Sequence, residues 1–194
     1  ELIQAEIIRH EVGMQGYSNT VVARIMAILN RSDQRMFIEL VSLLSDVDPL
    51  TFKAERLASM LASVRSMITA SNEDAGRKLL DELREFVDYE TAYLHQMLLA
   101  NTPAAVHVAA VSANAVYSAA MSRPFQGVLL KEVWKDVADQ KMKLVRQSIA
   151  QGYLEGKTTD QIIRELRGTK AKGFTDGLVQ KSRRDVEAVV RTAI

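Results

Sequence analysis

Residues 149–168 read IAQGYLEGKTTDQIIRELRG, and residues 169–193 continue TKAKGFTDGLVQKSRRDVEAVVRTA. Gly152 and Gly156 are predicted to end the helix that enters this stretch. Thr158 stands three residues before Gln161, which is the spacing of a helix capping box, and Gly168 stands where a C-cap glycine belongs. The stretch therefore predicts a helix, a glycine turn, a short capped helix, a loop and a final helix. Glycines and caps account for this pattern, and no position in it calls for a catalytic side chain.

Helical periodicity also dominates the chain before this stretch. Apolar residues recur three and four positions apart across residues 57–68 and again across residues 79–98. β-branched residues do not alternate with polar ones over a useful length, so strands are not expected. We predict a mainly α-helical fold.

Helix boundaries are predicted from the glycines, prolines and capping residues. We expect the opening helix to end at Gly13 and Gly16, and a further helix to begin at a cap on Ser32 or Asp33. Asp48-Pro49 and Thr102-Pro103 each read as a capping residue followed by proline at the first helical position. Residues 104–121, rich in Ala, Ser and Val, are then expected to form a buried or interface helix.

The best domain boundary is Arg123-Pro124, where a proline breaks the chain after the Ala-rich segment. Residues 1–123 are expected to form an N-terminal helical bundle. Residues 124–194 are expected to form a small helix-turn-helix-loop-helix domain. Six of the nine glycines follow residue 126, which is consistent with tighter turns in this second unit.

Composition limits the protein class. The 194 residues are 47% apolar and 25% charged, which are ordinary globular values. There is no cysteine, so disulfides, thiolate nucleophiles and Cys-ligated zinc are excluded. No apolar run approaches the roughly 18–20 residues that span a bilayer, and no secretory signal is visible. Residues 131–194 carry a net charge of +5 and residues 1–130 carry −4, so the C-terminal part can face phosphate or an acidic protein surface, or simply be a solvated basic face.

Searches for catalytic and ligand-binding motifs give no candidate. The three histidines, His10, His95 and His107, do not have metal-ligand spacing. The run from Gly152 to Thr158 resembles a P-loop, but it has one residue too few between the glycines and follows a helix, so we interpret it as a turn with a cap. We therefore expect no enzyme activity, no cofactor and no metal.

The predicted final helix carries the residues with the most functional character, namely Lys181, Arg183, Arg184 and Arg191. Arginine forms bidentate, charge-assisted bonds with phosphate, which favours DNA contact. The alternative is pairing with Asp185, Glu187 and neighbouring acids inside the fold. We favour the structural alternative for Arg191 and leave both open for the other three.

Residues 149–193 resemble the family of phage Mu F-like and SPP1-like minor head (head morphogenesis) proteins. In that family a helix leads into a glycine turn, followed by a short helix headed by Ser or Thr, a variable basic loop and a helix that ends in an Arg-Thr pair. The residues that carry the resemblance are Gly152, Gly156, Thr158, Ile162, Leu166, Arg183, Arg191 and Thr192. The resemblance covers the C-terminal part only.

The resemblance implies a minor virion protein in the capsid interior near the portal, made in the host cytoplasm. Its implied partners are portal protein or other capsid proteins, with DNA and a second copy of the chain as further possibilities, and it implies ejection with the DNA in some phages. One alternative is a helical nucleic-acid-binding module outside any virion. A third hypothesis is an enzyme whose site forms only between helices.

Overall fold

The computed structural model describes residues 2–47, 52–124 and 127–194, and this part of the chain is almost entirely helical. About 82% of the chain is helical and the residues described contain no strand, so the prediction of a mainly α-helical fold is confirmed. The helices in chain order are α1 (Leu2–Ser45), α2 (Ala54–Met60), α3 (Ala62–Asn101), α4 (Ala113–Ser122), α5 (Leu130–Leu154), α6 (Thr159–Arg167), the 3₁₀ helix η1 (Lys170–Lys172) and α7 (Leu178–Ala193).

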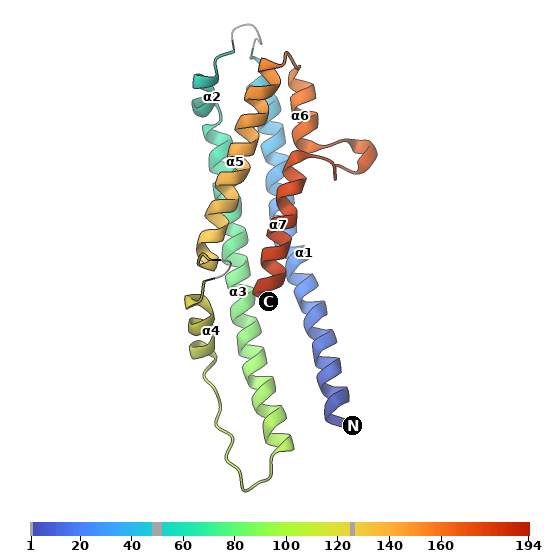
Figure 1. The fold of residues 1–194 in the computed structure, drawn as a ribbon, viewed down its shortest axis with the longest axis vertical. Coiled ribbons are helices and arrows are strands. Elements are labelled where there is room, and N and C mark those ends of the chain that lie inside the picture. Colours follow the sequence, from blue (N-terminus) through green and yellow to red (C-terminus); the bar gives the residue numbers. More distant parts are fainter. Residues whose placement is uncertain (1, 48–51, 125–126) are drawn as a thin grey trace.

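The molecule is an elongated bundle built around two long helices. α1 and α3 run antiparallel along its whole length, and α5 packs against α3 while α7 packs against α1 (Figure 1). α6 joins α5 to α7 at one end of the bundle. The opposite end, toward which α3 descends, consists of α1, α3 and the segment that leads to α4 (Figure 1).

Two hydrophobic cores follow one another along the bundle. The first lies near α6 and includes Leu40, Leu61, Val145 and Leu166. The second lies nearer the middle and includes Val21, Leu79, Trp134 and Val190, among others. Segments from both sides of residues 123 and 124 contribute to each core. The division into two domains there stays a prediction, but the two units share their buried surface.

The expected break in the first helix is wrong. α1 continues through Gly13 and Gly16 and through Ser32 and Asp33 to Ser45. A glycine inside a helix costs only about 1 kcal/mol, and the burial of Val21 and later apolar residues of α1 against α3, α5 and α7 outweighs that cost. Asp33 does not cap a helix, because its side chain is buried in an ion pair.

The expected helix over residues 104–121 is also only partly present. Thr102 ends α3 in an extended conformation, residues 107–112 are irregular and mostly exposed, and α4 begins only after Ser112. The Ser112 hydroxyl accepts a hydrogen bond from the Ala115 N–H at 3.4 Å and so supplies the cap. No residue of α4 is buried, so the expectation of a buried helix is wrong, while that of an interface helix stays a prediction. The other predicted Pro-containing cap, Asp48-Pro49, lies outside the described residues.

None of the described helices combines the length and apolar character that a membrane crossing needs.

Candidate functional site

The predicted glycine turn and capped helix are present at residues 152–168. The Thr158 hydroxyl accepts from the Gln161 N–H at 3.3 Å, and the Gln161 side-chain oxygen accepts from the Thr158 N–H at 2.9 Å. Gly156 and Gly168 have φ angles of +72° and +93°, which other residues rarely adopt. The capping box and the C-cap glycine are therefore confirmed.

Gly152 does not end its helix, contrary to the prediction, because α5 continues to Leu154. Its role is close packing against α6. A Cβ at Gly152 would lie 2.8 Å from the Cδ1 of Ile162, a side chain that is fully buried. The absence of a side chain at residue 152 therefore sets how closely α5 and α6 approach.

The same turn is joined to the end of α1. The hydroxyls of Tyr153 and Thr159 both donate to the backbone oxygen of Leu44, at 3.4 and 3.2 Å. Lys157, the residue that gave the turn its likeness to a P-loop, pairs with Glu155 at 2.8 Å and Glu165 at 2.7 Å. Its ammonium group is thus held by carboxylates of the turn and α6.

Arg183 lies in a buried ion-pair network between three helices. Asp33 of α1 accepts hydrogen bonds from Lys141 of α5 and from the guanidinium of Arg183 of α7, with 3.1 Å between Arg183 Nε and Asp33 Oδ2. The Arg183 guanidinium also donates to Asn30 and to Gln180. Burial lowers the pKa of the Lys141 ammonium group, although Asp33 opposes this. Arg183 therefore connects α7 to the bundle, and phosphate contact would require these bonds to break.

Arg191 is paired as well. Its guanidinium donates to Glu187 one turn earlier at 2.9 Å and to Asn19 of α1 at 2.6 Å. The Thr192 hydroxyl donates to the Ala188 backbone oxygen at 2.8 Å. The Arg-Thr pair thus uses one side chain to contact α1 and the other within α7.

Arg184 differs from these two arginines. It is exposed, and it has no ion-pair or hydrogen-bond partner among the described residues. Lys181 lies in α7, but its side chain is outside the described residues. Of the four basic residues predicted as one group, Arg183 and Arg191 are thus paired within the fold, and their proposed contact with DNA or a partner stays a prediction.

A second buried carboxylate, Glu82 of α3, was missed by the sequence analysis. Its side chain is fully buried and accepts from Arg24 at 2.7 Å, Lys78 at 2.8 Å and the Tyr17 hydroxyl at 3.0 Å. Burial alone would raise the pKa of Glu82, but the three hydrogen bonds outweigh it and lower that pKa. Burial and the bond to Glu82 raise the pKa of the Tyr17 phenol to about 12. The one local signal for this cluster is the i,i+4 spacing of Lys78 and Glu82, because Tyr17 and Arg24 lie 65 and 58 positions away.

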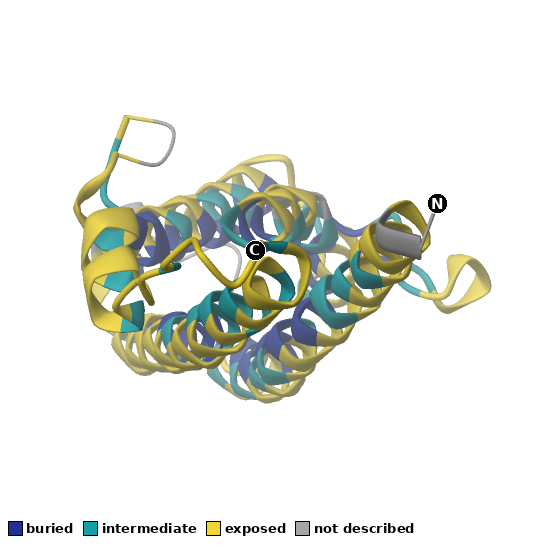
Figure 2. Cartoon of the chain, turned by 90° about the horizontal axis from the view of Figure 1, so that it is seen from below, coloured by how far each residue is buried: buried dark blue, intermediate teal, exposed yellow. Residues whose placement is uncertain are grey.

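The far end of the bundle has a different character. We call residues 4–17 of α1 and 85–101 of α3 the distal end. Here α1 and α3 contact each other through His10, which stacks on Tyr93 with 3.8 Å between ring centres and pairs with Glu90 at 2.9 Å. Most other residues of the distal end are exposed (Figure 2), and the large apolar side chains among them are Ile7, Ile8, Val12, Tyr89, Leu94, Leu98 and Leu99.

A groove of ≈ 440 Å³ runs between α1 and α3 at the distal end. We call it the distal groove. The rings of Tyr17 and Phe86 stack along it with 5.7 Å between their centres. Its lining residues are Arg9, His10, Gly13, Met14, Tyr17, Glu85, Phe86 and Tyr89.

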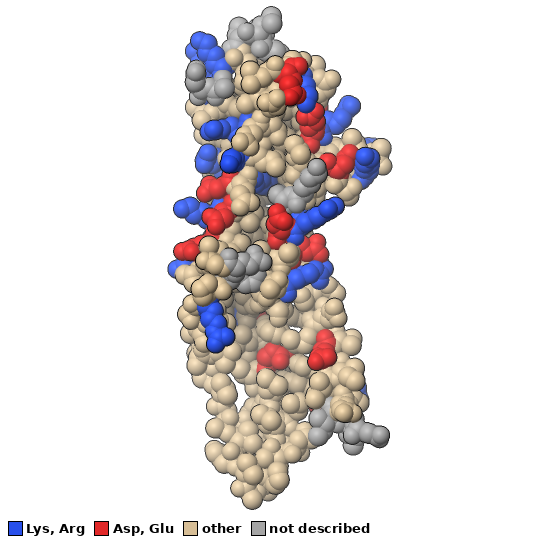
Figure 3. Space-filling view, viewed as in Figure 1, with Lys and Arg blue, Asp and Glu red and all other residues tan. Residues whose placement is uncertain are grey.

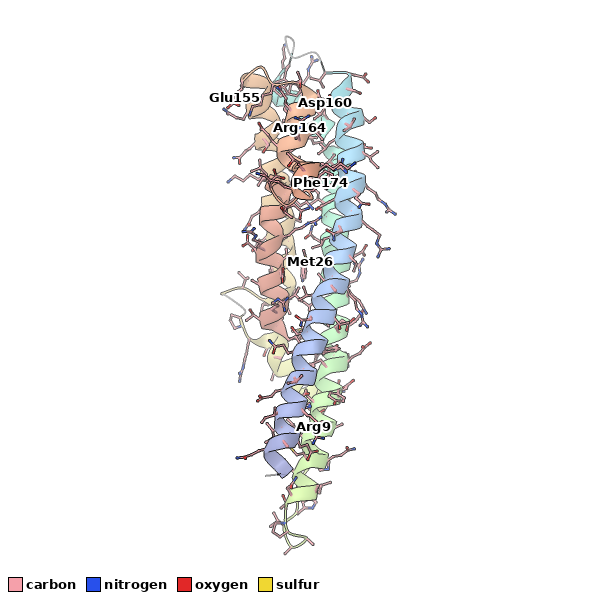
Figure 4. All side chains as sticks on the ribbon, turned by 90° about the vertical axis from the view of Figure 1, so that its right-hand side faces the viewer. Arg9, Met26, Glu155, Asp160, Arg164 and Phe174 are labelled. Carbon is pink, nitrogen blue, oxygen red and sulfur yellow. The ribbon has the colours of Figure 1, made fainter. Side chains whose placement is uncertain are left out.

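The distal end is poor in positive charge. Residues 85–122 contain no Lys or Arg, and Arg9 is the one such residue in residues 2–23. The lower third of the face in Figure 3 is accordingly almost free of charge apart from two acidic patches. Arg9 lies near the lower end of α1, whereas Glu155, Asp160 and Arg164 lie at the α6 end (Figure 4).

The described residues include no group of three or more His, Asp or Glu side chains that could hold a metal ion. The ionisable side chains that are buried, Asp33, Glu82 and Lys141, are all used in ion pairs between helices. The described surface thus has an apolar, acidic distal end and a mixed, partly basic remainder.

Comparisons with known proteins do not assign the chain to a family. No protein-family model, curated protein or solved structure matches it. The resemblance of residues 149–193 to the Mu F-like head proteins thus stays a prediction.

Proposed function

We propose that this protein is a non-enzymatic structural protein of a phage head, which binds portal protein or another capsid protein by surface contact. The observation that carries the binding role is the distal end, where two long helices expose large apolar side chains around a groove. Exposed apolar patches next to polar rims are typical of protein interaction sites. The phage assignment rests on the resemblance of residues 149–193.

The geometry of the C-terminal helices supports this assignment. The glycine turn, the capped α6, the loop and α7 occur in the order that the family resemblance implies. α6 and α7 are then held on α1 by buried apolar residues and by the Asp33 network. This arrangement leaves the distal end uncovered at the other end of the bundle (Figure 1).

The function is tested with intact particles. Mass spectrometry of purified phage heads before and after DNA release should detect the protein, in few copies, inside the capsid near the portal. Loss of the protein on DNA release would identify it as an ejected component, and retention as a resident one. Its absence from the heads at every stage would exclude a virion role.

The second candidate is a helical nucleic-acid-binding module outside any virion. The exposed guanidinium of Arg184, within residues 131–194 and their net charge of +5, favours it. Phosphate contacts release counterions, so such binding weakens steeply with salt. Titration of labelled duplex DNA at several salt concentrations tests this candidate: a measurable affinity that falls steeply with salt would support it, and no DNA binding at low salt would exclude it.

A further inference from the structure

We propose that the distal groove binds an amphipathic α-helix of a partner protein, whose apolar face is bordered by Lys or Arg. This inference rests on the proposed function, because the partner is the head protein to which the chain attaches. It goes further by naming the surface and the chemistry of the partner segment.

The shape of the distal groove fits a helix. Its walls are two antiparallel helices, and helices commonly fill such grooves with apolar residues three and four positions apart. Gly13 has no neighbouring heavy atom within 4 Å of an ideal Cβ, so it leaves one wall open. From Arg9 to Tyr17 the groove follows α1 for about 12 Å, or roughly two helical turns.

The distal groove continues an interface that a helix already forms in this protein. α7 packs against α1 higher in the bundle, and its end lies above the space between α1 and α3 (Figure 1). Tyr17 and Ile194 both pack against the second core, and Tyr17 is also the upper lining residue of the groove. A partner helix in the groove would therefore extend the packing of α7 along α1, with α3 in place of α5 as the second wall.

The charge of the distal end indicates which residues should border the apolar face of the partner helix. The distal end carries five carboxylates, Glu6, Glu11, Glu85, Asp88 and Glu90, against Arg9 and two histidines. Glu85 lines the groove and is exposed, and the described residues give it no hydrogen bond or close ion pair. Lys or Arg beside the apolar face of the bound helix would pair with these groups and speed association.

Two peptides test the proposal. Both contain Leu at positions three and four apart and are about 15–18 residues long, because shorter peptides are marginally helical; one has Lys at the remaining positions and the other Glu. Fluorescence anisotropy of the labelled peptides measures binding to the full chain. We expect the Leu–Lys peptide to bind at least about tenfold more tightly than the Leu–Glu peptide, a difference of about 1.4 kcal/mol.

Two glycines of α1 provide a matched pair of variants. Gly13→Leu places a side chain in the groove, and it should lower the affinity for the Leu–Lys peptide about tenfold or more. Gly16→Leu is the control, since Gly16 also has open space around an ideal Cβ but does not line the groove. Both changes replace glycine inside a helix, so neither should lower stability. Equal binding by the two variants would overturn the proposal.

Glu85→Lys tests the charge. This change should lower the affinity for the Leu–Lys peptide and raise the affinity for the Leu–Glu peptide. Glu73→Lys, at an exposed position elsewhere on α3, is the control and should alter neither affinity. Equal affinity of each peptide for all of these variants would contradict the proposal that Lys or Arg border the apolar face of the bound helix. Sedimentation of the chain alone supplies a further check: a dimer that Gly13→Leu dissociates would mean that a second copy, and not a partner helix, occupies the groove.

The two proposals fail separately. If the protein is found in phage heads but the peptides do not bind in the groove, the groove inference fails and the head function stands. If the peptides bind as expected but the protein is absent from heads, the head function fails and the groove remains a helix-binding site.

Discussion

Asp33 of α1 and Lys141 of α5 form an ion pair whose side chains are only 4% and 6% exposed. The two residues are 108 positions apart, and Arg183 of α7 shares the same carboxylate. One acid thus joins three helices near the middle of the bundle. Removing it would leave two buried or half-buried cations without a counter-charge, which is far more costly than losing a surface pair.

The first prediction concerns this acid. We expect Asp33→Ala to lower the free energy of unfolding by about 3–5 kcal/mol, because Lys141 and Arg183 lose their shared partner. Urea denaturation followed by circular dichroism measures this. Asp74→Ala is the control, since its pair with Arg77 has side chains 58% and 65% exposed and should contribute less than about 1 kcal/mol. Similar losses in the two variants would show that the network is not buried in solution.

The buried Glu82 leads to a prediction about acid stability. Its pKa is lowered in the folded state by Lys78, Arg24 and Tyr17. A lowered folded-state pKa gives stability that is present above the unfolded-state pKa, which is near 4.5, and is lost as the pH falls through the folded-state value. We therefore expect unfolding to become easier on acidification below about pH 4.5.

Glu82→Gln isolates this effect, because the amide does not titrate in this range. The variant should be less stable at pH 7 and should lose less stability between pH 5 and pH 3 than the wild type. Chemical denaturation at a series of pH values measures the free energy of unfolding at pH 7 and its change between pH 5 and pH 3. Glu73→Gln, at an exposed position on the same helix, should follow the wild-type curve.

The close approach of α5 and α6 gives a third prediction. Gly152→Ala should destabilise the protein by about 1–3 kcal/mol, because the added Cβ meets the buried Ile162 side chain. Ile162→Ala removes Cγ1 and Cδ1, the two side-chain atoms that lie nearest to that Cβ. The double variant should therefore lose less than the sum of the two single losses, and additive losses in a double-mutant cycle would rule out this contact.

The local signals in the sequence predicted the C-terminal helices well. Capping at Thr158 and the C-cap at Gly168 depend on residues within a few positions of one another, and both are present. The network of Asp33 could not be predicted, because its members lie 108 and 150 positions apart. Local rules also favoured a helix cap at Asp33, whereas long-range packing keeps α1 continuous.

Periodicity predicted the helix around residues 79–98 but not what covers it. The stripe is buried at Leu79 and Leu83, where α1 and α5 pack against α3. Farther along, Leu94 and Leu98 belong to the same stripe and are 45% and 48% exposed, because α5 and α7 do not extend that far. An apolar stripe indicates that a face needs a partner, and only the fold shows where that partner is missing.

The last prediction concerns DNA contact by α7. Arg183 and Arg191 are held by Asp33 and Glu187, whereas Arg184 is exposed and has no partner in the described part of the chain. We expect Arg184→Ala to weaken DNA retention at low salt and to reduce the slope of log affinity against log salt by about 0.9, the value for one phosphate contact. Its unfolding free energy should stay within about 0.5 kcal/mol of the wild type. Arg183→Ala, in contrast, should destabilise the fold, so any DNA effect there must be corrected for unfolded protein. An unchanged salt slope in Arg184→Ala would remove this face of α7 from any nucleic-acid interface.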